Sequence, residues 1–327
     1  MEFNAIARDR VAFQQPVTQT NLQALACRAF GAGTEVQSAT ELSGGHYNTT
    51  FDVRIRGHAP LILRVAPEPA RQSRLEYALM RNEYASLPYF ASLRDMFPQI
   101  MFADWTHDLI DRDYLWQTRL NGVPGLIGIK AYPRTHWLPL YQQLGSLTRQ
   151  VHQVRGTRFG SVAGPYFDIW SEFVLATLDA SIGDLADAGL DTSDVTNVIK
   201  AVERQPELLD EIKESRLLHG DLWTGNLLLA DGAVEPTVVG VVDNDRASWG
   251  DPAADWGCTV ILSKSTEAQA AFAEAYGAVA DTPAARWRAL VYRAMHLIAG
   301  RLERHRLGNS NEVTASYDEL RSVLQQL

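Results

Sequence analysis

The chain has 327 residues, of which 39 are acidic and 30 are basic, and its formal net charge is -9. Its length allows two lobes, and its 46% apolar and 21% charged residues are ordinary for a globular protein and unlike a disordered one. The acidic balance argues against general nucleic-acid binding, which needs a basic surface, but it is compatible with a cationic small-molecule partner.

The first third of the chain combines strand and helix patterns. Strand-like alternation with turn signals predicts three strands there, and helical periodicity predicts two helices. The predicted strands cover residues 48–56, 61–65 and 113–120, and the predicted helices cover residues 20–31 and about 72–87. This part of the chain should therefore form a small antiparallel sheet with helices beside it.

Helical patterns dominate the rest of the chain and are interrupted by one compact β segment over residues 217–242. Because the strands gather instead of alternating with helices, the order of elements predicts an α+β fold. We expect an N-terminal lobe over residues 1–116, a hinge over 117–122 and a larger, mainly helical C-terminal lobe over 123–327. The predicted helices of the second lobe cover residues 138–153, 168–181, 193–213, 267–279, 284–305 and 313–326.

The motif HGDLWTGN at residues 219–226 carries the strongest chemical signal. Its aspartate and asparagine are five positions apart and follow a histidine, which is the spacing of a kinase catalytic loop. A carboxylate at Asp221 can accept the proton of an attacking hydroxyl, and an amide oxygen at Asn226 can hold a metal ion near phosphates. The alternative is a loop in which both side chains only cap turns.

A second carboxylate follows at the end of an apolar strand. Residues 227–229 and 238–242 are predicted to form a hairpin, and Asp243 comes directly after it. Because a hairpin returns the chain to its start, Asn226 and Asp243 should meet where a kinase places its metal-binding aspartate. Asp245 could bind a second metal ion, orient the substrate or only satisfy backbone donors.

Weaker signals for a nucleotide site come from the predicted N-terminal lobe. The turn Ser43-Gly44-Gly45 could fold over phosphates, although glycine-bearing hairpins are common. Arg64 interrupts an apolar strand, and Glu83 falls on the same helix face as three leucines. An inward arginine and an inward glutamate suggest the ion pair that positions nucleotide phosphates in kinases. A purely structural salt bridge is the alternative.

Kinases usually place a lysine at this strand position, but this chain has no lysine before Lys130. An arginine must therefore take the role, and Arg64 is the best placed, with Arg54 and Arg56 as alternatives. The replacement is chemically workable because arginine is always charged and binds phosphate through a planar fork of N–H groups.

With these residues in place, the chain resembles the aminoglycoside phosphotransferase family, which is related to choline and fructosamine kinases and has a protein-kinase-like, bilobal fold. The resemblance covers about residues 40–260. It rests on the segments SGG…NTTF, LILR, LTRQVH, HGDLWTGNLLL and VVDNDRASWGDPAADW, and on the helix that carries Glu83. The arginine at position 64 departs from the usual lysine.

The resemblance implies that Asp221 is the catalytic base and that Asn226 and Asp243 bind Mg²⁺. It also implies that Asp251 and Asp255 are structural caps and loop anchors. Residues expected to bind ATP or GTP are Ser43, Gly44, Gly45, Asn48, Arg64 and Glu83, together with the connector residues Gln117, Thr118, Arg119 and Leu120.

The expected activity is Mg²⁺-dependent phosphoryl transfer from ATP or GTP to a hydroxyl of a small molecule. We expect the acceptor to be an aminoglycoside or another hydroxylated antibiotic, in resistance or self-protection. A metabolic kinase acting on a fructosamine, sugar or amino alcohol is the alternative, and a nucleotide-binding pseudokinase is an alternative of another class. Tyr166, Trp249 and Asp245 are candidates for the substrate cleft, although such aromatic residues are more often part of a core.

Cysteine content and hydropathy bear on the compartment. Cys27 and Cys258 are too few for a disulfide framework or a zinc site. The first residues lack the apolar segment of a secretion signal, and no apolar run approaches the roughly 20 residues that cross a bilayer. We expect a cytoplasmic protein, monomeric or homodimeric, without membrane or nucleic-acid partners.

Overall fold

Six strands form one sheet in the N-terminal part of the chain, according to a computed structural model that describes residues 1–9 and 12–327. They lie in the order β1-β2-β3-β4-β6-β5, and only the first pair is parallel. The predicted strands are confirmed as β3, β4 and β6, and β2 is the strand that a hairpin at the glycine turn requires, whereas β1 and β5 were not predicted. The bounds are β1 Glu2–Asn4, β2 Val36–Glu41, β3 Thr49–Ile55, β4 Leu61–Val65, β5 Ile100–Asp104 and β6 Tyr114–Thr118.

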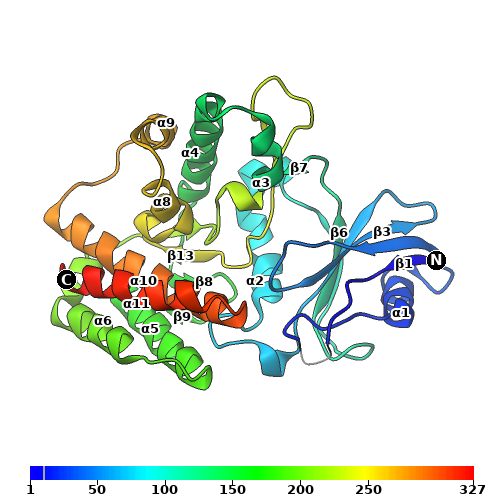
Figure 1. The fold of residues 1–327 in the computed structure, drawn as a ribbon, viewed down its shortest axis with the longest axis horizontal. Helices are drawn as coiled ribbons and strands as arrows, with labels where there is room; N and C mark the ends of the chain where they lie inside the picture. Colours follow the sequence, from blue (N-terminus) through cyan, green and yellow to red (C-terminus); the bar gives the residue numbers. More distant parts are fainter. Residues whose placement is uncertain (10–11) are drawn as a thin grey trace.

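The central strand β4 is buried along its whole length, because elements cover both faces of the sheet. Leu61, Leu63 and Val65 belong to a core that includes residues of helix α1 (Gln19–Phe30). Successive side chains of a strand point to opposite faces, so Arg64 points away from this core. Helix α2 (Leu79–Ser86) lies on that other face, between the sheet and the helical part of the molecule (Figure 1).

The predicted helix over residues 72–87 is wrong in its first half. Only α2 is helical, and Ala78 just before it adopts a left-handed conformation with φ of 57°. The segment 72–78 turns because the carboxylate of Asp184 accepts the backbone N–H groups of Arg74 at 2.8 Å and Leu75 at 3.2 Å. Contacts with the C-terminal part therefore replace the helical hydrogen bonds there. Two 3₁₀ segments flank this region, at Pro69–Arg71 and Leu87–Met96.

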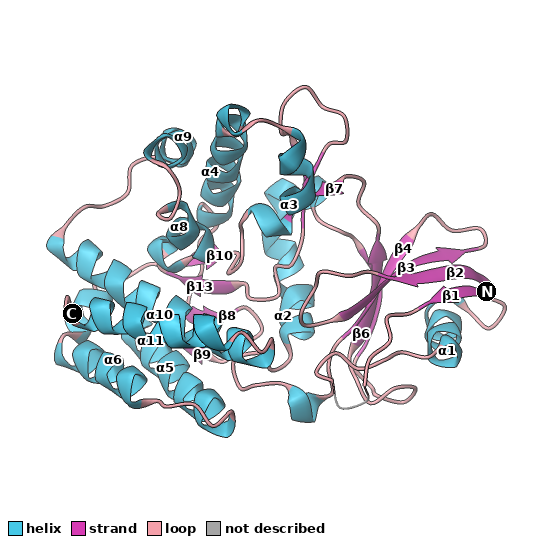
Figure 2. Cartoon of the chain, viewed as in Figure 1, coloured by secondary structure: helices cyan, strands magenta, loops and turns pink. Residues whose placement is uncertain are grey.

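The C-terminal part is mainly helical, so the α+β, bilobal fold class is confirmed (Figure 2). The predicted helix over 193–213 is split, because Pro206 has no N–H to continue α6 and begins α7 instead. None of the helices in the described part of the chain is long and apolar enough to span a membrane. The helix bounds are α3 Gly125–Gly128, α4 Leu138–His152, α5 Trp170–Asp187, α6 Ser193–Arg204, α7 Pro206–Leu209, α8 Trp256–Ile261, α9 Thr266–Tyr276, α10 Pro283–Arg306 and α11 Ser310–Leu324.

Two short sheets sit among these helices. One contains the expected hairpin of β11 and β12, with β7 on the other side of β11. The other has the order β10-β13-β8-β9. Their bounds are β7 Val123–Pro124, β8 Phe159–Ser161, β9 Tyr166–Phe167, β10 Arg216–Leu218, β11 Leu227–Leu229, β12 Val238–Val241 and β13 Ser248–Gly250.

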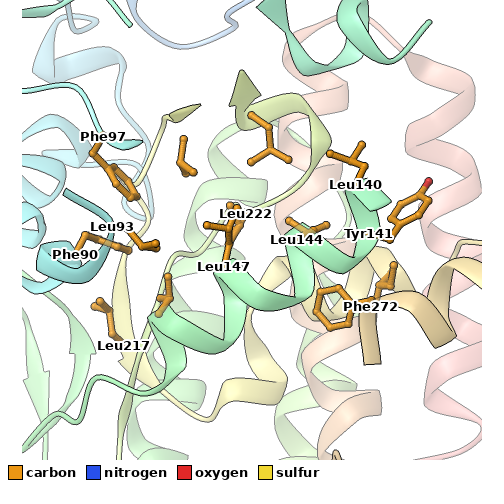
Figure 3. Packing of buried hydrophobic residues seen from close by; sticks show 14 of the residues in the cluster. Phe90, Leu93, Phe97, Leu140, Tyr141, Leu144, Leu147, Leu217, Leu222 and Phe272 are labelled. Atoms are coloured by element: carbon orange, nitrogen blue, oxygen red, sulfur yellow. The ribbon is translucent and has the colours of Figure 1, made fainter. Parts of the chain in front are cut away.

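The core beneath these sheets fixes the loop between β10 and β11. Leu222 is 1% exposed and belongs to the same cluster as Leu144 and Leu147 of α4, which approach it in Figure 3. Phe90 lies in the 3₁₀ segment after α2, and Phe97 directly follows that segment. Both pack into the cluster from the side opposite α4. A buried leucine next to Asp221 therefore anchors the backbone of that residue.

Candidate active site

Asp221 and Asn226 contact each other directly in the loop that leads into β11. The side-chain nitrogen of Asn226 donates to Oδ2 of Asp221 at 2.7 Å and to its backbone carbonyl at 2.8 Å. Gly220 precedes them with φ of 83°, and a Cβ there would lie 2.3 Å from the carbonyl oxygen of Arg246. Only glycine fits this turn. Because the amide nitrogen of Asn226 is engaged, its oxygen is the atom left for a cation.

Asp255 anchors the same loop through hydrogen bonds to its backbone, as expected. It is 1% exposed, and its carboxylate accepts the backbone N–H groups of His219 at 2.9 Å and Gly220 at 3.0 Å. His152 contacts it through Nε2 at 3.0 Å. Asp251 also has the expected structural role, because it accepts the N–H of Ala253 at the start of a 3₁₀ turn. Neither carboxylate is left for chemistry.

The hairpin returns Asp243 to the side of Asn226. The N–H of Val242 donates to the carbonyl of Asn226 at 3.0 Å, which fixes the two loops together. Asp243 has φ of 69°, a left-handed conformation that is uncommon for aspartate. Its carboxylate accepts Nη2 of Arg64 at 2.9 Å. The predicted convergence of the two loops is therefore present in the fold.

The environment of Asp221 suits a proton acceptor. Burial raises its pKa, and the negative charge of nearby Asp243 raises it further, to about 7. The charge of Arg246 and the hydrogen bond from Asn226 oppose part of this rise. A carboxyl group that titrates near neutrality can take a proton from a hydroxyl and release it again.

Arg64 contacts residues of both parts of the molecule. Its Nη1 lies 2.5 Å from Oε1 of Glu83 on α2, and its Nη2 binds Asp243, so one guanidinium bridges two carboxylates. Arg64 and Glu83 are 7% and 3% exposed. Burial raises the pKa of Glu83, and Arg64 opposes that rise. Arg54 and Arg56, the alternatives to Arg64, are exposed and pair with Asp52 and Glu35 instead.

The side chains around Asp243 fit a magnesium ion better than a metal with a closed protein cage. They offer one carboxylate and the amide oxygen of Asn226, which are hard oxygen ligands. Within residues 1–9 and 12–327, no group of three or more His, Cys, Asp or Glu residues could hold a metal ion. Mg²⁺ is typically bound by one or two carboxylates together with substrate phosphates, so a sparse protein site matches it.

The glycine turn at Ser43-Gly44-Gly45 is an exposed loop between β2 and β3. Gly44 has φ of 105°, and space is open around a Cβ placed on either glycine. Gln14 steadies the turn by donating to the carbonyls of Gly45 at 2.9 Å and Asn48 at 2.8 Å. The side-chain oxygen of Asn48 is buried without a hydrogen-bond partner in the described structure. Nothing in the sequence pointed to Gln14.

The connector Gln117-Thr118-Arg119-Leu120 leaves the sheet at the end of β6. The N–H groups of Thr118 and Arg119 donate to the carbonyls of Gln99 at 2.9 Å and Pro60 at 3.3 Å. The side chain of Arg119 binds Asp52 at 2.9 Å. These N–H groups and the Arg119 side chain already form bonds within the sheet. A purine bound here would therefore have to form hydrogen bonds with the other backbone atoms of the connector.

The three candidates for the substrate cleft lie in different surroundings. Asp245 is 6% exposed next to the site, and burial followed by the charge of Asp243 raises its pKa well above the usual value. Trp249 packs in the core, with its ring 4.9 Å from that of Tyr89. Tyr166 is half exposed on β9, and its hydroxyl donates to the carbonyl of Val162. No contact in the described residues links either aromatic side chain to Asp221.

Sequence reasoning missed Asn82, which fixes the loop after β12. Its side-chain nitrogen donates to the carbonyls of Asp245 and Ala247, both at 2.8 Å, and its oxygen accepts the N–H of Ala163 at 2.8 Å. The residue is 6% exposed. A polar residue beside Glu83 on the inward side of a helix was the signal that could have identified it.

Two buried histidines should make the fold sensitive to acid. Burial lowers the pKa of His219 and of His296 to about 4, from about 6.5 in an unfolded chain. Between these values the unfolded state binds protons that the folded state excludes, so stability is full above pH 6.5 and falls as the pH drops toward 4. We expect a loss of up to about 1.4 kcal/mol per histidine and pH unit.

Urea unfolding of the wild type and of His296→Gln at pH 7.5 and pH 5 measures this effect. The variant should lose less stability between the two pH values than the wild type. His305→Gln, an exposed histidine on the same helix, is the matched control and should behave as the wild type. Equal losses in all three proteins would contradict the prediction for His296.

Comparisons with known proteins concern the family and the fold of the chain. The model of the phosphotransferase enzyme family matches residues 38–290. The GDP and kanamycin complex of APH(2")-IIIa is 17% identical, with a TM-score of 0.65 over 94% of this chain and 99% of the other. A thermostable mutant of aminoglycoside phosphotransferase APH(4)-Ia, in ternary complex with ADP and hygromycin B, is 17% identical, with a TM-score of 0.64 over 93% and 98%. These structures share the fold. No curated protein sequence matches the chain.

Proposed function

The chain belongs to the phosphotransferase enzyme family and is a small-molecule phosphotransferase, and from this premise we propose that it transfers the γ-phosphoryl group of ATP or GTP to a hydroxyl of a hydroxylated antibiotic, with an aminoglycoside as the first candidate. One observation carries the proposal. Asp221, Asn226 and Asp243 converge from two loops, and Arg64 holds the last of them in place.

In this reaction Asp221 aligns the acceptor hydroxyl and takes its proton. The acceptor oxygen forms a bond to the γ-phosphorus, and the bond between that phosphorus and the β-phosphate oxygen breaks, which leaves the nucleoside diphosphate. Asn226 through its free amide oxygen, and Asp243 through its carboxylate, would hold Mg²⁺, which neutralises phosphate charge when bound. Catalysis then rests mainly on positioning and charge stabilisation.

The nucleotide would lie between the glycine turn and Arg64. The backbone N–H groups of Ser43, Gly44 and Gly45 are in an exposed turn that can close on phosphates. Arg64 has N–H groups beyond the two that bind Glu83 and Asp243, and these can reach the α- and β-phosphates. We propose the lobe boundary at residues 117–122; the end of β6 at Thr118 and the start of the next strand at Val123 support it.

The choice of acceptor rests on fold neighbours whose structures contain kanamycin or hygromycin B. The same neighbours contain GDP in one case and ADP in the other, so both nucleotides are tested. A metabolic kinase for a sugar or amino alcohol would use the same three residues, and the acceptor experiment distinguishes the two roles.

The test incubates the protein with a panel of aminoglycosides, nucleoside antibiotics and sugars, with ATP or GTP and Mg²⁺. We expect one class of acceptor to gain the mass of one phosphoryl group and the nucleotide to become the diphosphate. Chelating Mg²⁺ with EDTA should stop turnover, and added Mg²⁺ should restore it. Thermal stabilisation by nucleotide without turnover of any acceptor would instead indicate a nucleotide-binding pseudokinase.

A further inference from the structure

A buried carboxylate outside the expected site joins both parts of the molecule. Glu76 lies in the segment 72–78 before α2 and is 5% exposed. Its Oε2 accepts Nη1 of Arg306 at 2.7 Å, and its Oε1 accepts Nη2 of Arg306 and Nη2 of Arg246, each at 3.2 Å. Burial raises the pKa of Glu76, but the two arginines outweigh it and hold the pKa below its usual value. Glu76 is therefore an ionised partner of two cations.

The contacts around Glu76 extend to the glycine turn. The hydroxyl of Tyr47, two residues after Gly45, donates to the backbone carbonyl of Glu76 at 2.5 Å. The guanidinium of Arg306 lies 4.1 Å from the centre of the Phe13 ring, which in turn packs against Tyr47 at 5.6 Å. Because Arg306 is the last residue of α10, Glu76 holds the end of this helix against the residues that follow the turn.

Arg246 connects Glu76 to the proton acceptor. It lies three residues after Asp243, its carbonyl abuts Gly220, and its charge interacts with those of Asp245, Glu76 and Asp221. Among the described residues, Glu76 is the one acid with which it forms an ion pair. Its side chain is 39% exposed and flexible by nature, so without Glu76 it could turn toward the carboxylate of Asp221 and occupy it.

We propose that Glu76 is a positioning residue for phosphoryl transfer. It holds Arg246 beside Asp221 without letting it pair with that carboxylate. Through Arg306 it also fixes the end of α10 next to Tyr47. This inference rests on the proposed function. Glu76 touches neither substrate nor nucleotide in this role, and it acts through the two arginines.

The first measurement compares Glu76→Gln with the wild type, on the acceptor that the panel identifies. Glutamine keeps the shape but removes the charge that both arginines need. We expect kcat to fall about 10- to 100-fold, the usual effect of losing a supporting partner, while the KM for nucleotide stays within about threefold. Glu76→Asp should recover part of kcat, because it restores the charge. An unchanged kcat in folded Glu76→Gln would overturn the proposal.

A double-mutant cycle tests whether Glu76 acts through Arg246. If it does, Glu76→Gln should lower kcat much less in the Arg246→Met background than in the wild type, because the arginine that could occupy Asp221 is already absent and only the contact with Arg306 is lost. Fully additive losses in kcat would overturn this route. Asp318→Asn, which breaks an exposed ion pair with Arg321 on α11, is the matched control and should leave kcat unchanged.

Amide hydrogen exchange separates this inference from the proposed function, because it needs no turnover. In Glu76→Gln we expect faster exchange in residues 43–48 and 303–307 than in the wild type, as their common anchor is lost. If the wild type phosphorylates no acceptor, the proposed function fails, but faster exchange still supports the anchoring role of Glu76. Unchanged exchange in both segments would overturn that role.

Discussion

Replacing Asp221 by asparagine is expected to lower kcat by about 10²- to 10⁴-fold, the usual contribution of a general base. Asparagine has the same shape, and its side-chain oxygen can still accept the hydrogen bond that Asn226 donates at 2.7 Å. The loop should therefore keep its conformation, anchored by Leu222 in the core and by Asp255 below. The variant loses the carboxylate that accepts the proton of the acceptor hydroxyl in the proposed reaction.

Steady-state kinetics and nucleotide binding by calorimetry measure this prediction together. Nucleotide affinity should change little, because in the proposed reaction Asp221 contacts the acceptor and other residues hold the phosphates. The wild-type rate should decline on the acid side of the pKa of Asp221, and this decline should be absent from the variant. Asp231→Asn, in the exposed turn of the same hairpin, is the matched control. A variant of Asp221 that retains most of kcat would rule out this residue as the base.

The parts of the site that were predictable depend on short distances along the chain. Asp221 and Asn226 share one loop, and the turn of the hairpin returns Asp243 to Asn226, so spacing alone brings them together. The pairing of Arg64 with Glu83 followed from strand alternation and from the inward position of a charged residue among apolar ones. In these cases a local pattern contains the information about the contact.

The parts that were not predictable depend on contacts between distant segments. Arg64 and Asp243 are 179 residues apart, and Glu76 and Arg306 are 230 residues apart. The spacing of apolar and polar residues along the chain does not indicate such distant pairs. The same reason explains the wrong helix over residues 72–78, where the carboxylate of Asp184 on α5 takes the backbone N–H groups that a helix would have used. Tertiary contacts outweigh local propensity there.

Replacing Arg64 by methionine is expected to lower the free energy of unfolding by about 3–5 kcal/mol, because it leaves Glu83 as an uncompensated charge in a buried place. It should also lower kcat strongly, since Asp243 loses the partner that holds it at 2.9 Å. Urea unfolding and kinetics below the unfolding temperature measure the two effects. Arg54→Met, an exposed arginine of the neighbouring strand, is the control and should change stability by less than about 1 kcal/mol.

Two further variants separate the structural role of Arg64 from its role in the reaction. Arg64→Met/Glu83→Gln removes both buried charges, so it should regain much of the lost stability, while activity stays low because Asp243 is still without its partner. Arg64→Lys keeps the positive charge, but a single ammonium group cannot bridge Glu83 and Asp243 as the planar guanidinium does, so intermediate activity is expected. Recovery of full activity in the double variant would show that Arg64 contributes only to stability.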